Sequence, residues 1–233
     1  MLATDLFDVF RGQAQDEATP QKWSDAELYR WLNEAEVEAC RRARLLVDTQ
    51  NVSGDNNVCR IQLVNLTEFY NLDHRVIYVR RALMAGRNLP LEPVDYRDLD
   101  QCQPGWQART GQVNSYVRGL DTGKFRPYRI PTTASLANGS TVDLTVIREP
   151  LTPMDQNSPN VEPEINARYH MALLDWVYWR AYSKKDSEAY DPKLAAAHLA
   201  VFEAEFGTRE RASALEEEYQ RIQLPQGDLE ESY

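Results

Sequence analysis

Three histidines, His74, His170 and His198, are the residues that could bind a metal or relay protons at neutral pH. None of them lies at the HxxxH or HExxH spacing that puts two imidazoles on one helical face. His170 and His198 approach each other only if their helices pack antiparallel, and no carboxylates converge with them in the sequence. The pattern therefore favours structural histidines and predicts no metal site.

Motifs for nucleophilic or phosphate chemistry are also missing from the sequence. It contains no GxGxxG, Walker A or GxSxG motif, and residues 119–124 carry Gly119, Gly123 and Lys124 at the wrong spacing for a phosphate loop. A β-turn is the simpler interpretation of that stretch. No carboxylate pair can be assigned acid and base roles without geometry. We therefore expect no catalytic residue, no cofactor and no enzymatic activity.

The composition describes an acidic chain with enough apolar residues for a core. The 233 residues have a net charge of −10, a pI near 4.9 and 42% hydrophobic content. An acidic protein gains little from counterion release, which disfavours extensive binding to a DNA backbone but leaves a local basic patch open. Cys40, Cys59 and Cys102 lack metal or disulfide spacing and read as reduced thiols in a cytosolic product.

The first residues and the hydropathy pattern argue against export and membrane insertion. Residues 1–10 carry Asp5 and Asp8 but no basic residue before the apolar positions, unlike a secretory signal. No apolar run reaches the roughly 18 residues of a membrane span. We expect no membrane partner.

The sequence patterns at both ends of the chain predict helices. Ser24, with Glu27 three residues on, predicts a capped amphipathic helix over residues 25–47. Two further helices are expected at residues 172–182 and from Asp191-Pro192 to Gly207, where Ala195, Leu199, Phe202 and Phe206 form the inner stripe. A last helix is expected over residues 208–222.

The middle reads as β-structure. Alternating or β-branched stretches predict strands at residues 59–63, 76–80, 115–117, 125–130 and 142–147, with a short helix at residues 95–101 and a turn at residues 51–57. The four prolines between residues 148 and 163 indicate an extended, poorly packed connector.

Together these elements predict an α+β fold. We expect a helical bundle formed by the N- and C-terminal helices, with an inserted small antiparallel β domain, either a sandwich or a barrel. The expected domains are an N-terminal helical part at 1–50, the β domain at 51–150, a C-terminal helical part at 151–222 and an extended tail at 223–233.

Several residues are candidates for contacts with other subunits. Arg41, Arg42 and Arg44 cluster late in the first helix, where a solvated face near the helix C-terminus is the simpler interpretation and an acidic partner the alternative. The helix at 172–182 is apolar around nearly its whole circumference, so it is a core helix, an interface helix or both. Further candidates come from that helix and from the acidic tail, which either frays or orders on a partner: Trp176, Trp179, Tyr182, Ile222, Leu224, Leu229 and Tyr233.

Three stretches resemble the head-to-tail adaptor, or connector, proteins of tailed phages. The run Trp23-Ser24-Asp25-Ala26-Glu27-Leu28, continued by Trp31 to Ala35, resembles that family's N-terminal helix. Ile130-Pro131 and the stretch Val142 to Pro150 resemble its last strand, and the block from Glu162 to Gly207 resembles its helical hairpin. The resemblance covers about 110 residues in the expected order. One departure is Gly111 to Tyr116, which lacks the proline of a Gly-x-Pro-x-x-Tyr run.

The resemblance implies a structural protein of the virion neck. It implies a homo-oligomeric ring of about twelve copies under the portal protein, in contact with a tail or nozzle protein, and part of a channel through which genomic DNA passes without specific binding. A dodecamer of this kind takes part in DNA ejection, and an acidic channel wall would repel phosphates. Alternatives are another neck component, of the stopper or tail-terminator type, or a peptide- or sugar-binding module with Trp106, Tyr116 and Tyr128 in its groove.

Overall fold

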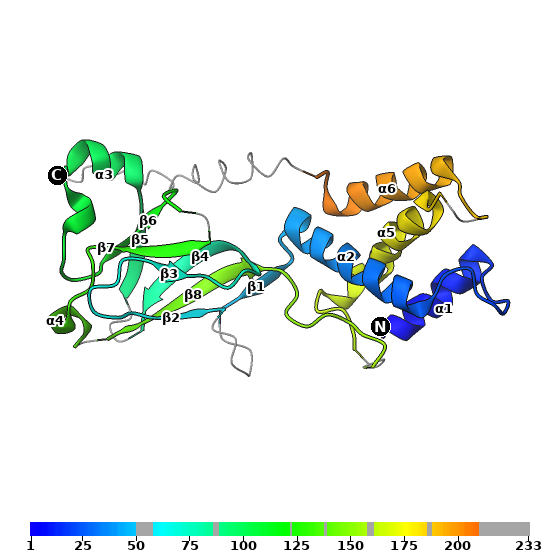
Figure 1. Cartoon of the computed structure of the whole chain (residues 1–233), viewed down its shortest axis with the longest axis horizontal. Helices are drawn as coiled ribbons and strands as arrows, with labels where there is room; N and C mark the ends of the chain where they lie inside the picture. Colours follow the sequence, from blue (N-terminus) through cyan, green and yellow to red (C-terminus); the bar gives the residue numbers. More distant parts are fainter. Residues whose placement is uncertain are drawn as a thin grey trace, which may run out of the picture. The chain divides into compact units, whose positions relative to one another are not determined.

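The computed structural model describes residues 1–49, 58–85, 89–121, 123–137, 139–157, 161–185 and 188–209. The described part is α+β, with six α-helices and a curled mixed sheet (Figure 1). Its residues fall into two compact units: Met1–Arg60, Asp73–Arg81 and Asp143–Arg209 in unit 1, and Ile61–Leu72 and Ala82–Val142 in unit 2. Strands β2, β4 and β8 each contribute residues to both units. The expected turn at residues 51–57 lies outside the described residues.

The helices of unit 1 are α1 (Ala3–Ala14), α2 (Asp25–Ala43), α5 (His170–Ser183) and α6 (Pro192–Phe206). The capping box at Ser24 is confirmed, because its side chain accepts the Glu27 N–H and the Glu27 carboxylate bonds back to the Ser24 N–H. The expected end of this helix near residue 47 is wrong. Arg44 adopts a left-handed conformation (φ 54°) that ends α2 and turns the chain into strand β1 (Leu46–Asp48).

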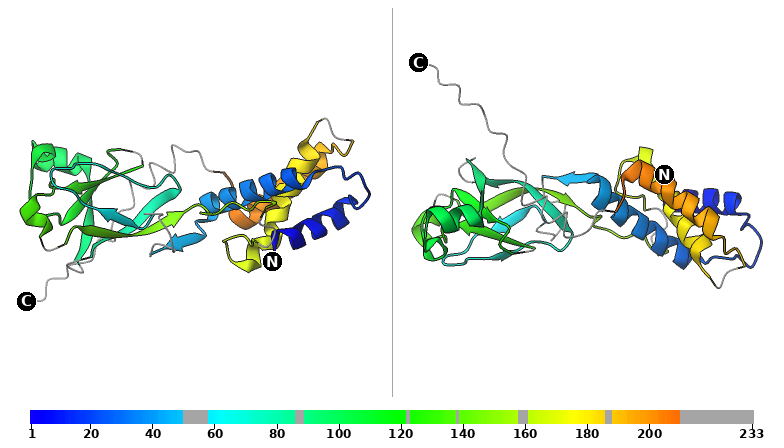
Figure 2. Two further views of the ribbon diagram at one scale, coloured as in Figure 1. Left: turned by 60° about the horizontal axis from the view of Figure 1, so that its bottom comes forward. Right: turned by 90° about the horizontal axis from the view of Figure 1, so that it is seen from above.

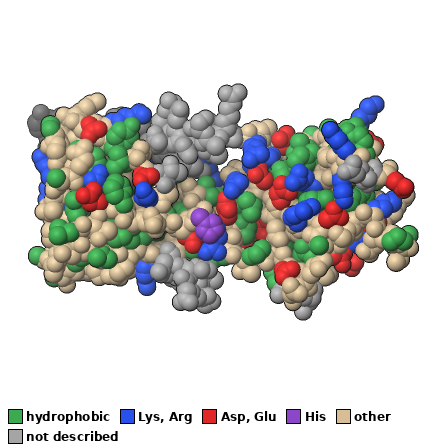
Figure 3. Space-filling view, viewed as in Figure 1, with side chains coloured by type: hydrophobic (Ala, Val, Ile, Leu, Met, Phe, Trp, Pro, Cys, Tyr) green, Lys and Arg blue, Asp and Glu red, His purple; other side chains and the backbone are tan. Residues whose placement is uncertain are grey.

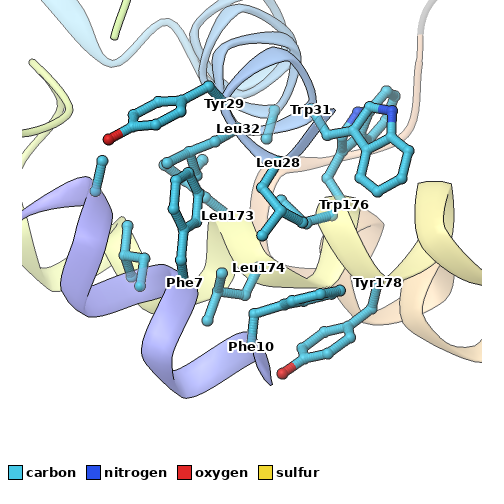
Figure 4. Close-up of a cluster of buried hydrophobic side chains, with 14 of the residues drawn as sticks. Phe7, Phe10, Leu28, Tyr29, Trp31, Leu32, Leu173, Leu174, Trp176 and Tyr178 are labelled. Carbon is cyan, nitrogen blue, oxygen red and sulfur yellow. The ribbon is translucent and has the colours of Figure 1, made fainter. Parts of the chain in front are cut away.

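The four helices bury one continuous apolar core in which α5 is the central element (Figure 4). α5 packs most extensively on α6 and then on α2 and α1, and Figure 2 shows α6 (orange) lying along α5 (yellow). The Phe10 ring stacks on Tyr178 with 4.8 Å between centroids, and Trp176 lies 5.0 Å from Phe202. Buried side chains therefore surround most of α5, as the apolar circumference of its sequence predicts.

The strands pair in the order β1-β8-β4-β5-β6-β7-β3, and β2 also pairs with β8. After β1, their bounds are β2 Arg60–Gln62, β3 Tyr70–Asn71, β4 Val76–Met84, β5 Leu89–Asp95, β6 Ser115–Arg118, β7 Lys124–Tyr128 and β8 Thr141–Arg148. The alternation expected in β8 is confirmed, since Val142, Leu144 and Val146 are buried while Asp143 and Thr145 are half-buried.

The expected purely antiparallel β domain is wrong at one pair of strands. β5 and β6 run parallel, with Glu92 opposite Ser115, so the sheet is mixed. A parallel pair needs a crossover that returns the chain to the same end of the sheet. Here the crossover carries helix α3 (Tyr96–Cys102) and the 3-10 turn η1 (Trp106–Ala108), and α3 is the short helix that the sequence predicts.

A second, smaller core lies within unit 2. In this core, α3 and η1 of the crossover pack on β6, and the buried residues are Leu99, Trp106 and Val117. Tyr116 and Phe125 stack across β6 and β7 with 5.3 Å between ring centroids. The remaining helix of this unit, α4 (Thr133–Leu136), is one turn long and is capped by Thr132.

The connector between β8 and the 3-10 turn η2 (Ala167–Tyr169) carries no helix or strand in its described residues, but it is packed more tightly than expected. Met154 is 2% exposed. The Asn33 side chain bonds both the N–H and the C=O of Met154, each at 2.8 Å. An amide on α2 that satisfies both backbone groups anchors the connector to unit 1, so the expectation of poor packing is wrong there.

Candidate assembly surface

Helix α6 is apolar on two faces. Its inner face carries the expected stripe, with Ala195, Phe202 and Phe206 buried and Leu199 half-buried. Its outer face is exposed yet also apolar: Leu194 is 39% and Val201 53% exposed, and the remaining exposed apolar residues are alanines, Ala196, Ala197, Ala200 and Ala204. Figure 3 shows hydrophobic side chains among charged ones over the region where Figure 1 labels α6. A surface helix normally has a polar outer face, so this one is the candidate contact surface of the unit.

Local sequence holds α6 firmly in place. The Asp191 carboxylate caps the helix by accepting the N–H groups of Lys193 and Leu194, and Pro192 occupies the first turn. At the other end Gly207 adopts a positive φ of 91° and donates its N–H to the Glu203 carbonyl. The outer face is therefore presented by a helix that is fixed at both ends.

Arg42 connects α2 to the end of α6. Its side chain is 5% exposed and pairs with Glu38 at 3.3 Å and Glu203 at 3.5 Å, while also donating to the Gly207 carbonyl at 3.1 Å. Its guanidinium lies over the rings of Trp176 and Phe202, at 5.4 and 5.3 Å from their centroids. Arg42, a candidate interface residue from the sequence, thus occupies an intramolecular site between three helices.

The two neighbouring arginines are placed differently. Arg41 is 49% exposed and its Nε lies 2.7 Å from a Glu149 carboxylate oxygen. Arg44 is half-buried at the left-handed end of α2. Of the three arginines in the expected cluster, Arg41 therefore has the side chain that is most open to a partner.

The aromatic candidates on α5 lie mainly in the core. Trp176 is 3% exposed, and the half-buried Trp179 packs against it at 4.5 Å. Tyr182 is half-buried and lies 6.1 Å from the Trp23 ring. The structure brings Arg42 and Trp176 together, while Trp179 and Tyr182 keep some surface for a partner. The four candidates in the tail, Ile222, Leu224, Leu229 and Tyr233, lie outside the described residues.

The three histidines have separate environments. His170 is buried and its Nε2 lies 2.9 Å from the Ile165 carbonyl oxygen, whereas His198 pairs with Asp175 at 2.8 Å and stacks on Tyr178. His74 is 85% exposed beside Asp73. Among the described residues, no three metal-ligating side chains are grouped so as to hold an ion.

A buried polar network joins α2 to the start of α5. The Glu36 carboxylate is 1% exposed and accepts the Ile165 N–H at 3.2 Å. Burial raises the pKa of Glu36 to about 7, against backbone hydrogen bonds that lower it. Nearby, Arg148 pairs with Glu164 at 2.6 Å and Asp48 at 3.1 Å.

Burial likewise raises the pKa of the Cys59 thiol to about 11 and that of Cys40 well above its usual range, which makes both thiols poor nucleophiles.

Unit 2 presents an exposed apolar loop that the sequence pattern did not reveal. Val64 is 53% and Leu66 64% exposed, and Leu66 adopts a positive φ of 58°. The Tyr70 hydroxyl bonds the N–H and C=O of Val64, and the Leu66 N–H donates to the Pro131 carbonyl. The loop is thus held in one conformation by the Tyr70 side chain and by the backbone carbonyl of Pro131.

The aromatic groove expected for a binding module is not formed by the described residues. Trp106 is 2% and Tyr116 4% exposed, so both belong to the interior of unit 2. Tyr128 is half-buried and bonds the Gln103 side chain.

None of the described helices has the length and hydrophobicity needed to cross a membrane. The model of the SU10 adaptor protein family matches residues 1–224 of the chain. A comparison of the chain with curated proteins found no match.

Proposed function

Because the chain belongs to the SU10 adaptor protein family, a family of phage head-to-tail adaptors, we propose that it forms a ring beneath the portal and joins capsid to tail. The family makes it a structural protein of the virion. The proposal adds a ring of about twelve copies, contacts with the portal and with a tail or nozzle protein, and a channel through which genomic DNA passes during ejection.

The apolar outer face of α6 is the observation that carries this proposal. Leu194 and Val201 are exposed on a helix that is fixed at both ends. Burial of exposed apolar side chains against a partner is favourable, because it removes apolar surface from water. Closed rings use two different complementary faces per subunit, and α6 supplies one of them.

In the proposed arrangement, the helices α1, α2, α5 and α6 form a bundle and the expected domain 51–150 is an inserted β domain. The helical part contacts the portal and neighbouring copies, with Arg41, Trp179 and Tyr182 at the contacts. Ile222, Leu224, Leu229 and Tyr233 anchor the tail on the portal. The net charge of −10 suits a channel wall that repels phosphates.

Native mass spectrometry of the chain mixed with the portal protein encoded near it tests the proposal. The expected species is a portal ring that carries a complete ring of this chain, whose mass gives the copy number. A chain that stays unbound to the portal contradicts the adaptor role and favours a stopper or tail-terminator position in the neck.

Deleting residues 224–233 tests the tail separately. The shortened chain should give the same circular dichroism spectrum and melting temperature as the full chain but a smaller fraction of occupied portal rings. Unchanged occupancy would exclude an anchoring tail.

A further inference from the structure

The exposed residues on the outer face of α6 repeat with coiled-coil spacing. Leu194, Ala197, Val201 and Ala204 follow one another at intervals of three, four and three residues, and all four are exposed. This is the spacing of the a and d positions in a heptad, sustained over two turns or more of the helix. These four residues form a seam on which a second helix could pack, on the side of α6 that faces away from α5.

We propose that this face pairs with the same face of a second copy of the chain, with the two α6 helices antiparallel. In that alignment, Leu194 lies opposite Ala204 of the second copy, and Val201 lies opposite Ala197. Every layer then combines one large and one small side chain, which gives even packing along the seam. A parallel pair would stack leucine on leucine and alanine on alanine, leaving gaps at the alanine layers.

The charges at the two ends of the face favour the same direction. Lys193 and Glu205 are both exposed, the first at the start of α6 and the second near its end. Antiparallel alignment brings Lys193 to the level of Glu205 of the second copy, on the opposite flank of the seam, so the two charges add a weak long-range attraction. Parallel alignment would instead bring like charges to the same level, where they repel weakly.

The size of the face predicts a weak, reversible pair. α6 has 15 residues and is therefore about 22 Å long, and the seam is one helix wide. Such a contact buries less than the roughly 1,200 Å² typical of stable complexes. It is also two-fold symmetric, so it closes on itself and cannot continue into a ring. The pair therefore belongs to the chain before assembly, and it covers the apolar face until another partner replaces the second copy.

Sedimentation velocity of the full chain alone, from micromolar to millimolar concentration, tests the pairing independently of any portal. We expect a dimer that forms with rising concentration, and Val201→Glu should raise its Kd about tenfold or more by placing a charge in the seam. Val47→Glu is the matched control, because Val47 is 48% exposed, close to the 53% of Val201, but lies on β1. A chain that remains monomeric throughout, or a control that weakens the dimer as much as Val201→Glu, overturns the proposal.

Cysteine cross-linking tests the direction of the helices. In a Cys102→Ser background, mixed Leu194→Cys and Ala204→Cys chains should form disulfide-linked heterodimers, while either chain alone should not. Two copies of residue 194 lie about 15 Å apart along an antiparallel pair, beyond the reach of a disulfide. Self-cross-linking of the Leu194→Cys chain contradicts the antiparallel alignment. A dimer that appears only after residues 210–233 are removed shows that the chain's own end covers α6, and also overturns the proposal.

Discussion

Helices α2 and α6 both pack on α5, but they differ on the side that faces away from it. The exposed positions of α2 include Asp25, Arg30 and Arg41, as expected for a helix whose outer face meets water. The exposed positions of α6 include Leu194 and Val201. Burial on the inner side is similar, with Leu28 and Leu32 of α2 and Phe202 of α6 all fully buried. The inner faces therefore contribute to the fold in the same way, and the outer faces differ in how much apolar surface they leave exposed.

The largest expected effect separates the two faces of α6. Phe202 is fully buried and packs on Trp176, so Phe202→Ala should lower the free energy of unfolding by about 3–5 kcal/mol. Val201→Ser, one residue away but 53% exposed, should change it by less than about 0.5 kcal/mol. Urea denaturation followed by tryptophan fluorescence measures both. Equal losses would mean that the outer face is already part of the core.

The inner face of α2 differs from that of α6 in containing a carboxylate, and this predicts a pH effect. Burial raises the pKa of Glu36 to about 7 from 4.5, so the folded protein holds its proton over a pH range in which the unfolded chain has lost it. This group therefore makes unfolding easier as the pH rises from 4.5 to 7, by up to about 3 kcal/mol, and adds no further change above pH 7.

Glu36→Gln keeps an acceptor for the Ile165 N–H without the titration. It should be more stable than the wild type at pH 8 and similar to it at pH 4.5, as measured by the urea midpoint. Glu34→Gln is the control, because Glu34 is 35% exposed and pairs with Arg180. Parallel pH profiles for wild type and Glu36→Gln would refute a buried titrating carboxylate.

A smaller effect should separate two neighbouring arginines of α2. Arg42→Met leaves Glu38, 9% exposed, with less of its compensating charge and removes the contacts to Trp176, so we expect a loss of about 2 kcal/mol. Arg41→Met removes an ion pair whose arginine is 49% exposed, and the loss should stay below about 1 kcal/mol. Thermal unfolding compares the two, and a larger effect at Arg41 would reverse the roles we assign to them.

Local signals in the sequence predict the ends of helices well but the pairing of strands less well. Ser24 with Glu27, and Asp191-Pro192 with Gly207, act on groups within one turn, and the structure confirms both. Strand β5 is absent from the strands that the sequence predicts, because it contains Pro90 and Pro93 and proline cannot donate a hydrogen bond to a sheet. Its parallel partner β6 is selected by long-range packing that no local pattern records.

The candidate surface shows a similar limit. The spacing of Leu194, Ala197, Val201 and Ala204 is visible in the sequence, but so is the inner stripe, and only the structure shows which of them is buried. The sequence does not distinguish Arg42 from its neighbours, because its contact with the distant Glu203 forms only in the folded chain. Helix α1 lacked a side-chain cap from Ser, Thr, Asn or Asp that would have marked its start, since Leu2 occupies that position.

The order of the helices along the chain also has a consequence during synthesis. α2 is complete at Ala43, but α5, on which it packs, begins only at His170. At the usual ribosomal rate of about 5–20 residues per second, the apolar face of α2 waits on the order of ten seconds for its partner. During that time the nascent chain exposes Leu28, Trp31 and Leu32, which are the sort of surface that chaperones bind. The yield of folded protein should therefore respond to translation speed and chaperone supply while the intervening β-strands are being made.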